Sequence, residues 1–348
     1  MDKKKKILVN LIKILLIILM VHAFNLIMMP KYITENYDGR IVAEFYKEKE
    51  CPDVIFLGSS TVYSATSPCV LYESYGITSY VLASSSQTSW NSYYMLKEAL
   101  KYGKPQMVVM DIGFLNQIEE YAEEVSNRKL FDYMKTSPNK FEAIEVSKAA
   151  VESKWSYIFP VLRYHERYKD LTPDDFKYAL YKPDVTYNGY IMNLNLSDSL
   201  EEVPVTLDTA EDYRLNAKNA DYLQKIITLC KDEGIQIMLV KTPSYNAKWG
   251  VNFENDITSI AALNGINYID FDLYQDKMNL NYLSDSPDNG GHLNLLGAEK
   301  YSFFLGSVIK DNYEITDRRN DTKVDSVWKD KVTKYNNDKL ERIAQFGR

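Results

Sequence analysis

The chain has 348 residues, of which 45% are hydrophobic and 26% are charged, and its formal net charge is −7. This composition supports one large packed domain or two ordinary ones, excludes a disordered chain and argues against nucleic acid as a partner. The three histidines and three cysteines include no CxxC pair, so neither a metal site nor a cofactor is expected. At most one disulfide can form, and Cys51–Cys69 is the candidate pair.

Residues 1–30 are interpreted as a membrane anchor. Four lysines, residues 3–6, precede a largely apolar run at residues 7–29. As a helix this run would extend about 34 Å, enough to cross a bilayer. By the positive-inside rule the N-terminus lies in the cytoplasm, and the remainder lies outside the cell membrane as a single-pass protein. A cleaved signal peptide, cut near residues 21–23, is the alternative, but the apolar run is long and the cleavage site is poor.

Residues 31–51 are polar and read as a stalk, and strands then alternate with helices at residues 52–311. Buried strands are predicted at residues 53–58, 79–82, 107–111, 235–240 and 266–271, because each is a short apolar run bounded by turn residues. Helices are predicted at residues 90–101, 212–231, 255–264 and 294–309. This alternation predicts an α/β domain with a parallel sheet between two layers of helices.

Two stretches depart from that pattern. Residues 114–210 are rich in tyrosine, with helical pieces at 140–153 and 173–180, and are interpreted as a mainly helical insertion. Residues 312–348 are highly charged and are predicted to form a solvated helical tail.

The residues with chemical potential follow the strands, because ligands bind at the carboxyl ends of parallel strands. Ser60 lies in a Gly-Ser-Ser turn directly after the first strand, where a serine can cap a helix or act as a nucleophile. His292 precedes the last helix in a loop with two glycines, and Asp288 is close enough to orient its ring. Alone, His292 would read as a residue on a solvated turn.

Together, the strand followed by Gly58-Ser59-Ser60 and the Asp288…His292 pair before the last helix resemble the SGNH/GDSL hydrolase superfamily. Within this superfamily the closer resemblance is to membrane-anchored Gly-Ser-Ser members, such as the D protein of lipoteichoic acid D-alanylation and alginate-type O-acetyltransferases. The resemblance implies a flavodoxin-like α/β/α sandwich. It also implies Ser60 as nucleophile, His292 as base and Asp288 as the orienting acid.

Some of the family's positions are altered in this chain. The family's second-block glycine falls at Ser86, whose backbone N–H remains available as an oxyanion donor. The family's third conserved segment, Gly-x-Asn-Asp, is shifted in position in this chain and lacks its aspartate. Asn116 and Gln87 are therefore the candidate side-chain donors of a hydrogen bond to the oxyanion. The family aspartate usually stands three residues before the histidine, where this chain has Asn289, so Asp288 is preferred to Asp285. Lys241, at a strand end, is a further candidate.

The resemblance implies a serine esterase or O-acyltransferase outside the cytoplasm. Its substrate would be a cell-surface polysaccharide or a teichoic-acid-like polymer, and a membrane-bound O-acyltransferase would be its partner. The altered blocks favour an alternative, a binding or assembly protein of the same fold with weak or no catalysis. A cytoplasmic nucleotide-binding domain is disfavoured by the anchor and by the lack of a phosphate-binding loop.

Overall fold

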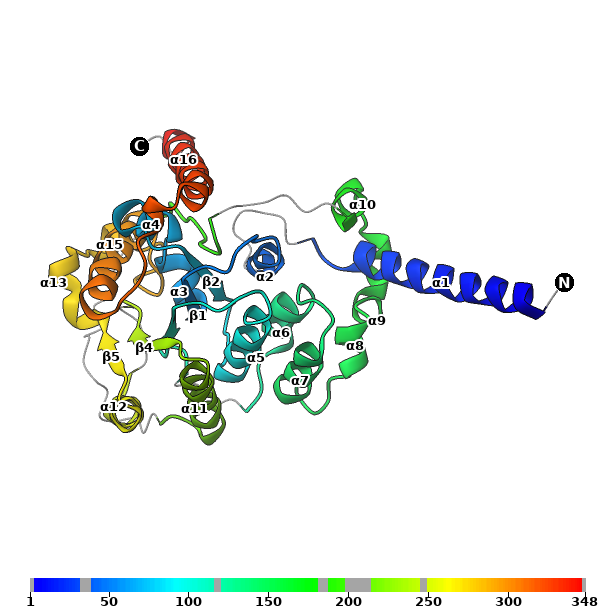
Figure 1. The fold of residues 1–348 in the computed structure, drawn as a ribbon, viewed down its shortest axis with the longest axis horizontal. Coiled ribbons are helices and arrows are strands. Elements are labelled where there is room, and N and C mark those ends of the chain that lie inside the picture. Colours follow the sequence, from blue (N-terminus) through cyan, green and yellow to red (C-terminus); the bar gives the residue numbers. More distant parts are fainter. Residues whose placement is uncertain are drawn as a thin grey trace. The chain divides into compact units, whose positions relative to one another are not determined.

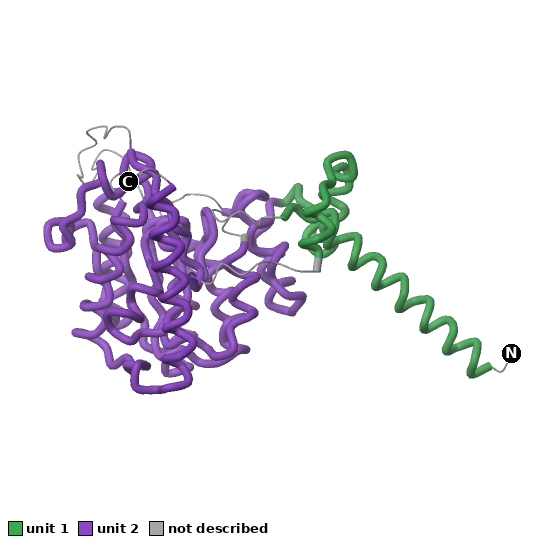
Figure 2. Tube along the Cα trace, turned by 90° about the horizontal axis from the view of Figure 1, so that it is seen from above, with its two compact units in different colours: residues 1–34, 150–184 green, residues 35–149, 185–348 purple. Residues whose placement is uncertain are grey.

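The computed structural model describes residues 3–31, 39–115, 120–180, 187–197, 214–244 and 249–345. It forms two compact units, shown in different colours in Figure 2. Unit 1 comprises residues 1–34 and 150–184, and unit 2 comprises residues 35–149 and 185–348.

Unit 2 is built on a five-stranded sheet in the order β2-β1-β3-β4-β5, and every neighbouring pair is parallel (Figure 1). The strands are β1 (Val54–Gly58), β2 (Ser79–Ala83), β3 (Met107–Asp111), β4 (Gln236–Lys241) and β5 (Asn267–Asp270). Each strand lies within about two residues of its predicted range. The prediction of an α/β fold with a parallel sheet is therefore confirmed.

Helices cover both faces of the sheet, so β1 is buried on both sides. One layer contains α3 (Ser60–Ala65), α4 (Pro68–Tyr75) and α15 (Leu295–Asn312), which pack on the face that Val54 and Phe56 present. The other layer contains α5 (Ser89–Ala99) and α11 (Ala217–Asp232) (Figure 1). Because successive strand residues point to opposite faces, a strand between two such layers must be apolar throughout.

The remaining elements of unit 2 flank this sandwich. They are α2 (Gly39–Phe45), α6 (Glu124–Phe131), α7 (Pro138–Ser147), α12 (Val251–Asn264), η2 (Phe271–Tyr274), α13 (Gln275–Met278), α14 (Tyr282–Asp285), η3 (Arg318–Asn320) and α16 (Thr322–Gln345). All three cysteines are free, so the candidate pair Cys51–Cys69 is not bridged.

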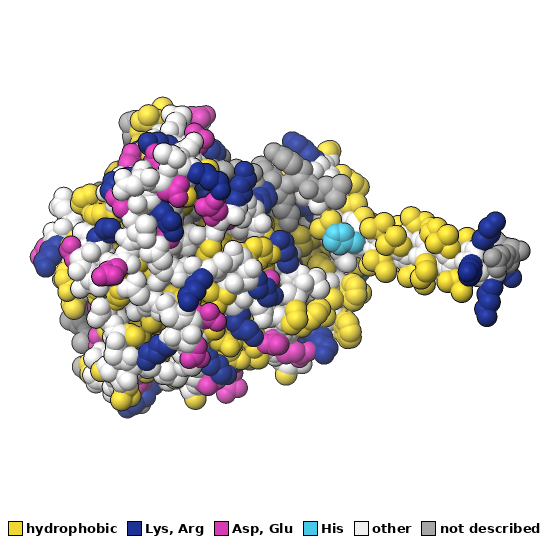
Figure 3. Space-filling view, viewed as in Figure 1, with side chains coloured by type: hydrophobic (Ala, Val, Ile, Leu, Met, Phe, Trp, Pro, Cys, Tyr) yellow, Lys and Arg dark blue, Asp and Glu magenta, His cyan; other side chains and the backbone are white. Residues whose placement is uncertain are grey.

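Unit 1 contains α1 (Lys3–Met28), α8 (Lys154–Ile158), α9 (Val161–Tyr164), η1 (His165–Lys169) and α10 (Pro173–Leu180). By length and composition α1 could cross a membrane. Figure 3 shows hydrophobic side chains along it and a cluster of basic side chains at its N-terminal end. The stretch interpreted as an insertion contributes α6 and α7 to unit 2 and α8 to α10 to unit 1.

The charged C-terminal segment is helical as expected, but it is not fully solvated. Trp328 of α16 is buried and stacks on Tyr72, with ring centroids 5.0 Å apart. Tyr335 is buried as well, and its hydroxyl donates to Glu299 at 2.8 Å. An apolar stripe within a charged sequence therefore packs α16 onto α4.

We expect Trp328→Ala to lower the free energy of unfolding by about 3 kcal/mol, because it leaves a cavity against Tyr72. The matched control is the neighbouring exposed residue, Val327→Ala, which should change it by less than about 0.5 kcal/mol. Urea unfolding followed by circular dichroism measures both values. Equal effects of the two substitutions would contradict the packed position of α16.

Candidate active site

Ser60 is placed by a tight turn at the carboxyl end of β1. Gly58 ends the strand, Ser59 is buried, and Ser60 is the partly exposed first residue of α3. A Cβ at position 58 would lie 2.5 Å from Cγ2 of Val62 and 2.7 Å from Cβ of Asp111. Only glycine fits this approach, so the turn requires Gly58 in order to present Ser60.

The ring of His292 is held at both nitrogens. Its Nε2 lies 2.7 Å from Oγ of Ser60, and its Nδ1 lies 2.5 Å from Oδ2 of Asp288. Ser60 and His292 are 232 positions apart in the sequence. The structure thus brings together the three residues that the sequence singled out. The side chains of His292 and Asp288 are 34% and 45% exposed, so the group is open to solvent.

The loop before α15 shapes this contact. Oδ1 of Asp288 accepts the backbone N–H of His292 at 2.8 Å, so the carboxylate holds both the ring and the main chain. Oγ of Ser286 accepts the N–H groups of Asp288 and Gly290. Asn289 and Gly290 have left-handed φ values of 57° and 89°. This tight turn lets a spacing of four residues bring the carboxylate to the imidazole.

Asp285, the more distant alternative acid, has a different position. It is fully buried, and Oδ2 accepts the Lys300 ammonium and the Asn281 N–H, both at 2.7 Å. Its backbone carbonyl also accepts the N–H of Asn294, which caps α15. Asp285 therefore anchors the start of the last helix.

Two backbone N–H groups are candidates for holding an oxyanion. Ser60 begins α3, and the first N–H groups of a helix have no partner within it. Ser86 follows β2, the strand beside β1, and has a left-handed φ of 53°. Gln87 is buried, and its amide donates to the Leu82 carbonyl and to Ser92, so its side chain braces this turn. Asn116 lies outside the described residues.

Lys241 lies beneath the site. Its buried ammonium is 2.5 Å from Asp272 and 3.3 Å from Asp270. Burial alone would lower the pKa of this ammonium, but the two carboxylates raise it above its usual value. Asp272 accepts the N–H of Ser244, whose hydroxyl donates to the carbonyl of Gly291 at 3.3 Å. Lys241 thus supports the loop that carries His292.

A lysine that the sequence analysis did not identify lies beside the Ser86 turn. Nζ of Lys129, on α6, donates to Oγ of Ser85 at 3.0 Å, and the hydroxyl of Tyr63 is 3.2 Å from the same oxygen. Tyr63 is one turn after Ser60 on α3. No motif marks Lys129, because its position depends on how α6 packs.

Asp111 lies at the end of β3, under the Gly58 turn. Its carboxylate accepts the N–H of Thr242 at 2.9 Å and the hydroxyl of Thr61 at 3.4 Å. Burial raises the pKa of this carboxyl to about 6, against the effect of these hydrogen bonds. Asp111 therefore links the turn that carries Ser60 to the end of β4.

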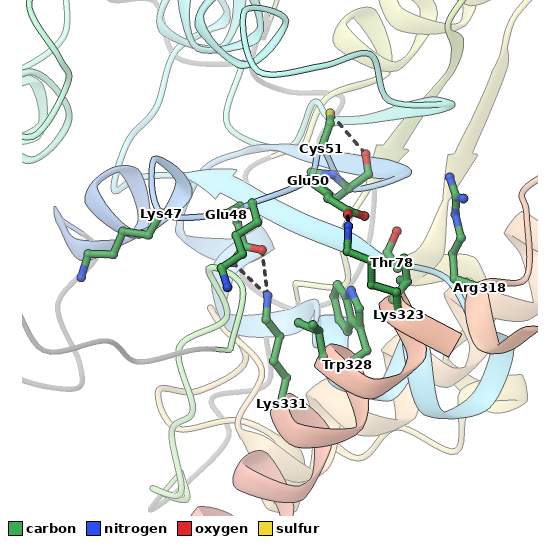
Figure 4. A pocket seen from close by; sticks show the side chains of 13 residues that line it. Lys47, Glu48, Glu50, Cys51, Thr78, Arg318, Lys323, Trp328 and Lys331 are labelled. Atoms are coloured by element: carbon green, nitrogen blue, oxygen red, sulfur yellow. Dashed lines mark hydrogen bonds and ion pairs between the residues drawn. The ribbon is translucent and has the colours of Figure 1, made fainter. Parts of the chain in front are cut away.

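A cavity of about 360 Å³ lies at the opposite edge of the sheet, before β1 and β2 (Figure 4). Ion pairs of Glu48 with Lys331 and of Glu50 with Lys323 join its two walls, at 2.8 Å each. Because this cavity lies at the end of the sheet opposite to Ser60, it is separate from the Ser60 site. Among the described residues, no group of three or more His, Cys, Asp or Glu side chains could hold a metal ion.

The arrangement can carry out acyl transfer, because a hydroxyl lies against an imidazole that a carboxylate orients. No protein-family model and no curated protein matches the sequence. Among solved structures, a GDSL-like lipase from Bacteroides thetaiotaomicron is similar, with 12% identity, coverage of 80% of this chain and 99% of that chain, and a TM-score of 0.34. A protein from Bacteroides fragilis described as an acylhydrolase has 13% identity, 77% and 94% coverage and a TM-score of 0.36.

We expect Asp111 to make stability depend on pH in a defined direction. Between pH about 4 and about 6 the folded protein keeps a proton that the unfolded chain has released, so the contribution of Asp111 to stability falls as the pH rises. Relative to Asp111→Asn, the wild type should lose about 3 kcal/mol across this interval. Urea unfolding of both proteins at several pH values measures the difference. A constant or rising difference would contradict the assignment.

Proposed function

We propose that the protein is a serine esterase or O-acyltransferase with Ser60 as nucleophile, His292 as general base and Asp288 as the orienting acid. The observation that carries this proposal is the pair of contacts on the His292 ring, 2.7 Å to Ser60 and 2.5 Å to Asp288. A carboxylate on Nδ1 keeps the proton there, so that Nε2 is free to accept the proton of the serine.

The reaction follows from this geometry. Oγ of Ser60 attacks the ester carbonyl while its proton passes to Nε2 of His292. The negative charge that develops on the carbonyl oxygen is stabilised by the N–H groups of Ser60 and Ser86. His292 then returns the proton to the departing alcohol oxygen, leaving an acyl ester on Ser60. A second hydroxyl, deprotonated by His292, then attacks that ester, the bond between the acyl carbon and Oγ of Ser60 breaks, and His292 returns the proton to Oγ of Ser60. Water as the second hydroxyl gives hydrolysis, and a glycan hydroxyl gives transfer.

We further propose that the protein acts outside the cytoplasm, as a single-pass membrane protein. The four lysines before the apolar helix α1 support this orientation. The solvent exposure of His292 and Asp288 suits an acyl group carried on a long polymer, which could not enter an enclosed cavity. A cell-surface polysaccharide or a teichoic-acid-like polymer is the proposed substrate, and a membrane-bound O-acyltransferase is the proposed partner.

One observation favours a second candidate, a binding or assembly protein with weak or no catalysis. The side-chain amide of Gln87 already donates to the Leu82 carbonyl and to Ser92 in the interior. It therefore does not replace the oxyanion donor that the family's third conserved segment would supply. If only the backbone N–H groups of the described residues hold the oxyanion, catalysis is weakened.

Covalent labelling with a fluorophosphonate probe separates the two candidates. We expect the folded wild type to be labelled and Ser60→Ala to lose the label and at least about 100-fold of aryl-ester hydrolysis, because the nucleophile is gone. Ser59→Ala is the matched control: its hydroxyl is buried beside Thr61, so this variant should keep the label.

Labelling that persists in Ser60→Ala would show that another residue reacts. A folded wild type that is not labelled would favour the binding protein.

A further inference from the structure

Unit 1 surrounds the C-terminal end of α1 with short helices. We call residues 150–180, which contain α8, α9, η1 and α10, the collar. The N–H of Val161 donates to Oδ1 of Asn25 at 3.0 Å, and Nη1 of Arg167 donates to the carbonyl of Met28 at 2.7 Å. The Arg167 bond satisfies one of the last carbonyls of α1, which have no partner within the helix, and together with the Asn25 bond it fixes the collar to the end of α1.

Two cations strengthen this attachment. Lys31 donates to the carbonyls of Ile27 and Met29, at 3.2 Å and 2.5 Å. Arg167 also pairs with Asp175 of α10 at 2.8 Å, and Lys31 lies 4.0 Å from the same carboxylate. The collar and the end of α1 are therefore joined by charged side chains as well as by packing.

The part of α1 that the collar does not contact is about as long as a bilayer core is thick. Residues 3–24 are exposed, and the collar contacts begin at Asn25. The apolar part of this stretch, residues 7–24, is about 27 Å long at 1.5 Å per residue. A hydrocarbon core is about 30 Å thick. When α1 crosses a bilayer, the collar therefore lies at the depth of the lipid headgroups.

The collar exposes an unusual number of large apolar side chains. Those exposed by more than a third are Val151, Trp155, Phe159, Leu162, Tyr168 and Phe176. Trp155 and Phe159 stack, with centroids 6.3 Å apart. Basic side chains accompany the aromatic rings: Lys154 lies over Trp155 and Lys169 over Tyr168. Exposed apolar patches mark contact surfaces, and aromatic rings beside lysines are typical of the membrane interface.

We propose that the collar is a lipid-binding surface that lies in the headgroup layer and inserts its apolar side chains among the upper acyl chains. This inference rests on the proposed membrane anchoring by α1. The occupant is the bilayer and not a protein, because the surface continues from the end of the spanning helix at headgroup depth. The collar would then set how far α1 enters the membrane.

The intrinsic fluorescence of Trp155 can report on the surroundings of the collar. The chain has four tryptophans, all among the described residues. Trp155 is 54% exposed, whereas Trp90, Trp249 and Trp328 are buried. The difference in fluorescence between the wild type and Trp155→Phe therefore gives the contribution of Trp155, and so of the collar, alone.

The full chain is reconstituted in vesicles of brominated phospholipids. In one set the bromine lies on the acyl chain near the headgroup, and in the other it lies at the end of the chain. We expect the fluorescence of Trp155 to fall at least about twofold when the bromine lies near the headgroups, and to fall less when it lies at the ends of the acyl chains. Acrylamide in the aqueous phase should not quench this fluorescence. Leu162→Gln with Phe176→Gln should reduce the bromine effect. The control pair, Leu263→Gln with Leu273→Gln on exposed sites of unit 2, should leave it unchanged.

The outcomes separate this inference from the proposed function. If an alkaline wash removes the chain from the vesicles, membrane anchoring fails and the collar proposal fails with it. If the chain stays anchored while acrylamide quenches Trp155 and bromine does not, the collar proposal alone is overturned. Trp155 shielded from both quenchers would indicate a protein contact and would overturn it too. Ester hydrolysis in the same vesicles tests the Ser60 chemistry independently.

Discussion

The candidate active site depends on one imidazole with a partner on each nitrogen. Ser60 reaches the ring of His292 from 232 positions away in the sequence, whereas Asp288 reaches it from the same loop. A parallel sheet makes this meeting possible, because the carboxyl ends of its strands lie at one edge. β1 delivers Ser60 through a turn that only Gly58 allows, and the loop before α15 delivers the other two residues.

Each side of this contact is held by buried polar groups. Asp111 ties the turn of Ser60 to the end of β4 through Thr61 and Thr242. The ion pair of Lys241 with Asp272 holds the loop of His292 through Ser244. These buried groups fix the backbone on both sides of the Ser60–His292 contact, where His292 and Asp288 themselves are partly exposed.

The sheet could be predicted because its signals are local, whereas Ser60, Asp288 and His292 stand out only in combination, through the resemblance of two distant segments to a known family. An apolar run bounded by Pro52 and Gly58 already predicts a buried strand, and a serine directly after it has few structural tasks. The positions of Gln87 and Lys129 could not be predicted, because they depend on which side chains meet after packing. The preference for Asp288 over Asp285 was available from the sequence, but its physical reason, the backbone turn at Asn289 and Gly290, was not.

In the proposed mechanism His292 and Asp288 act as one unit on Ser60. A double-mutant cycle of aryl-ester hydrolysis with His292→Ala, Asp288→Asn and the double variant tests it most directly. If Asp288 acts only through the imidazole, the double variant is as slow as His292→Ala alone. If the two losses multiply in the double variant, Asp288 acts independently of His292, and the account of this site is contradicted.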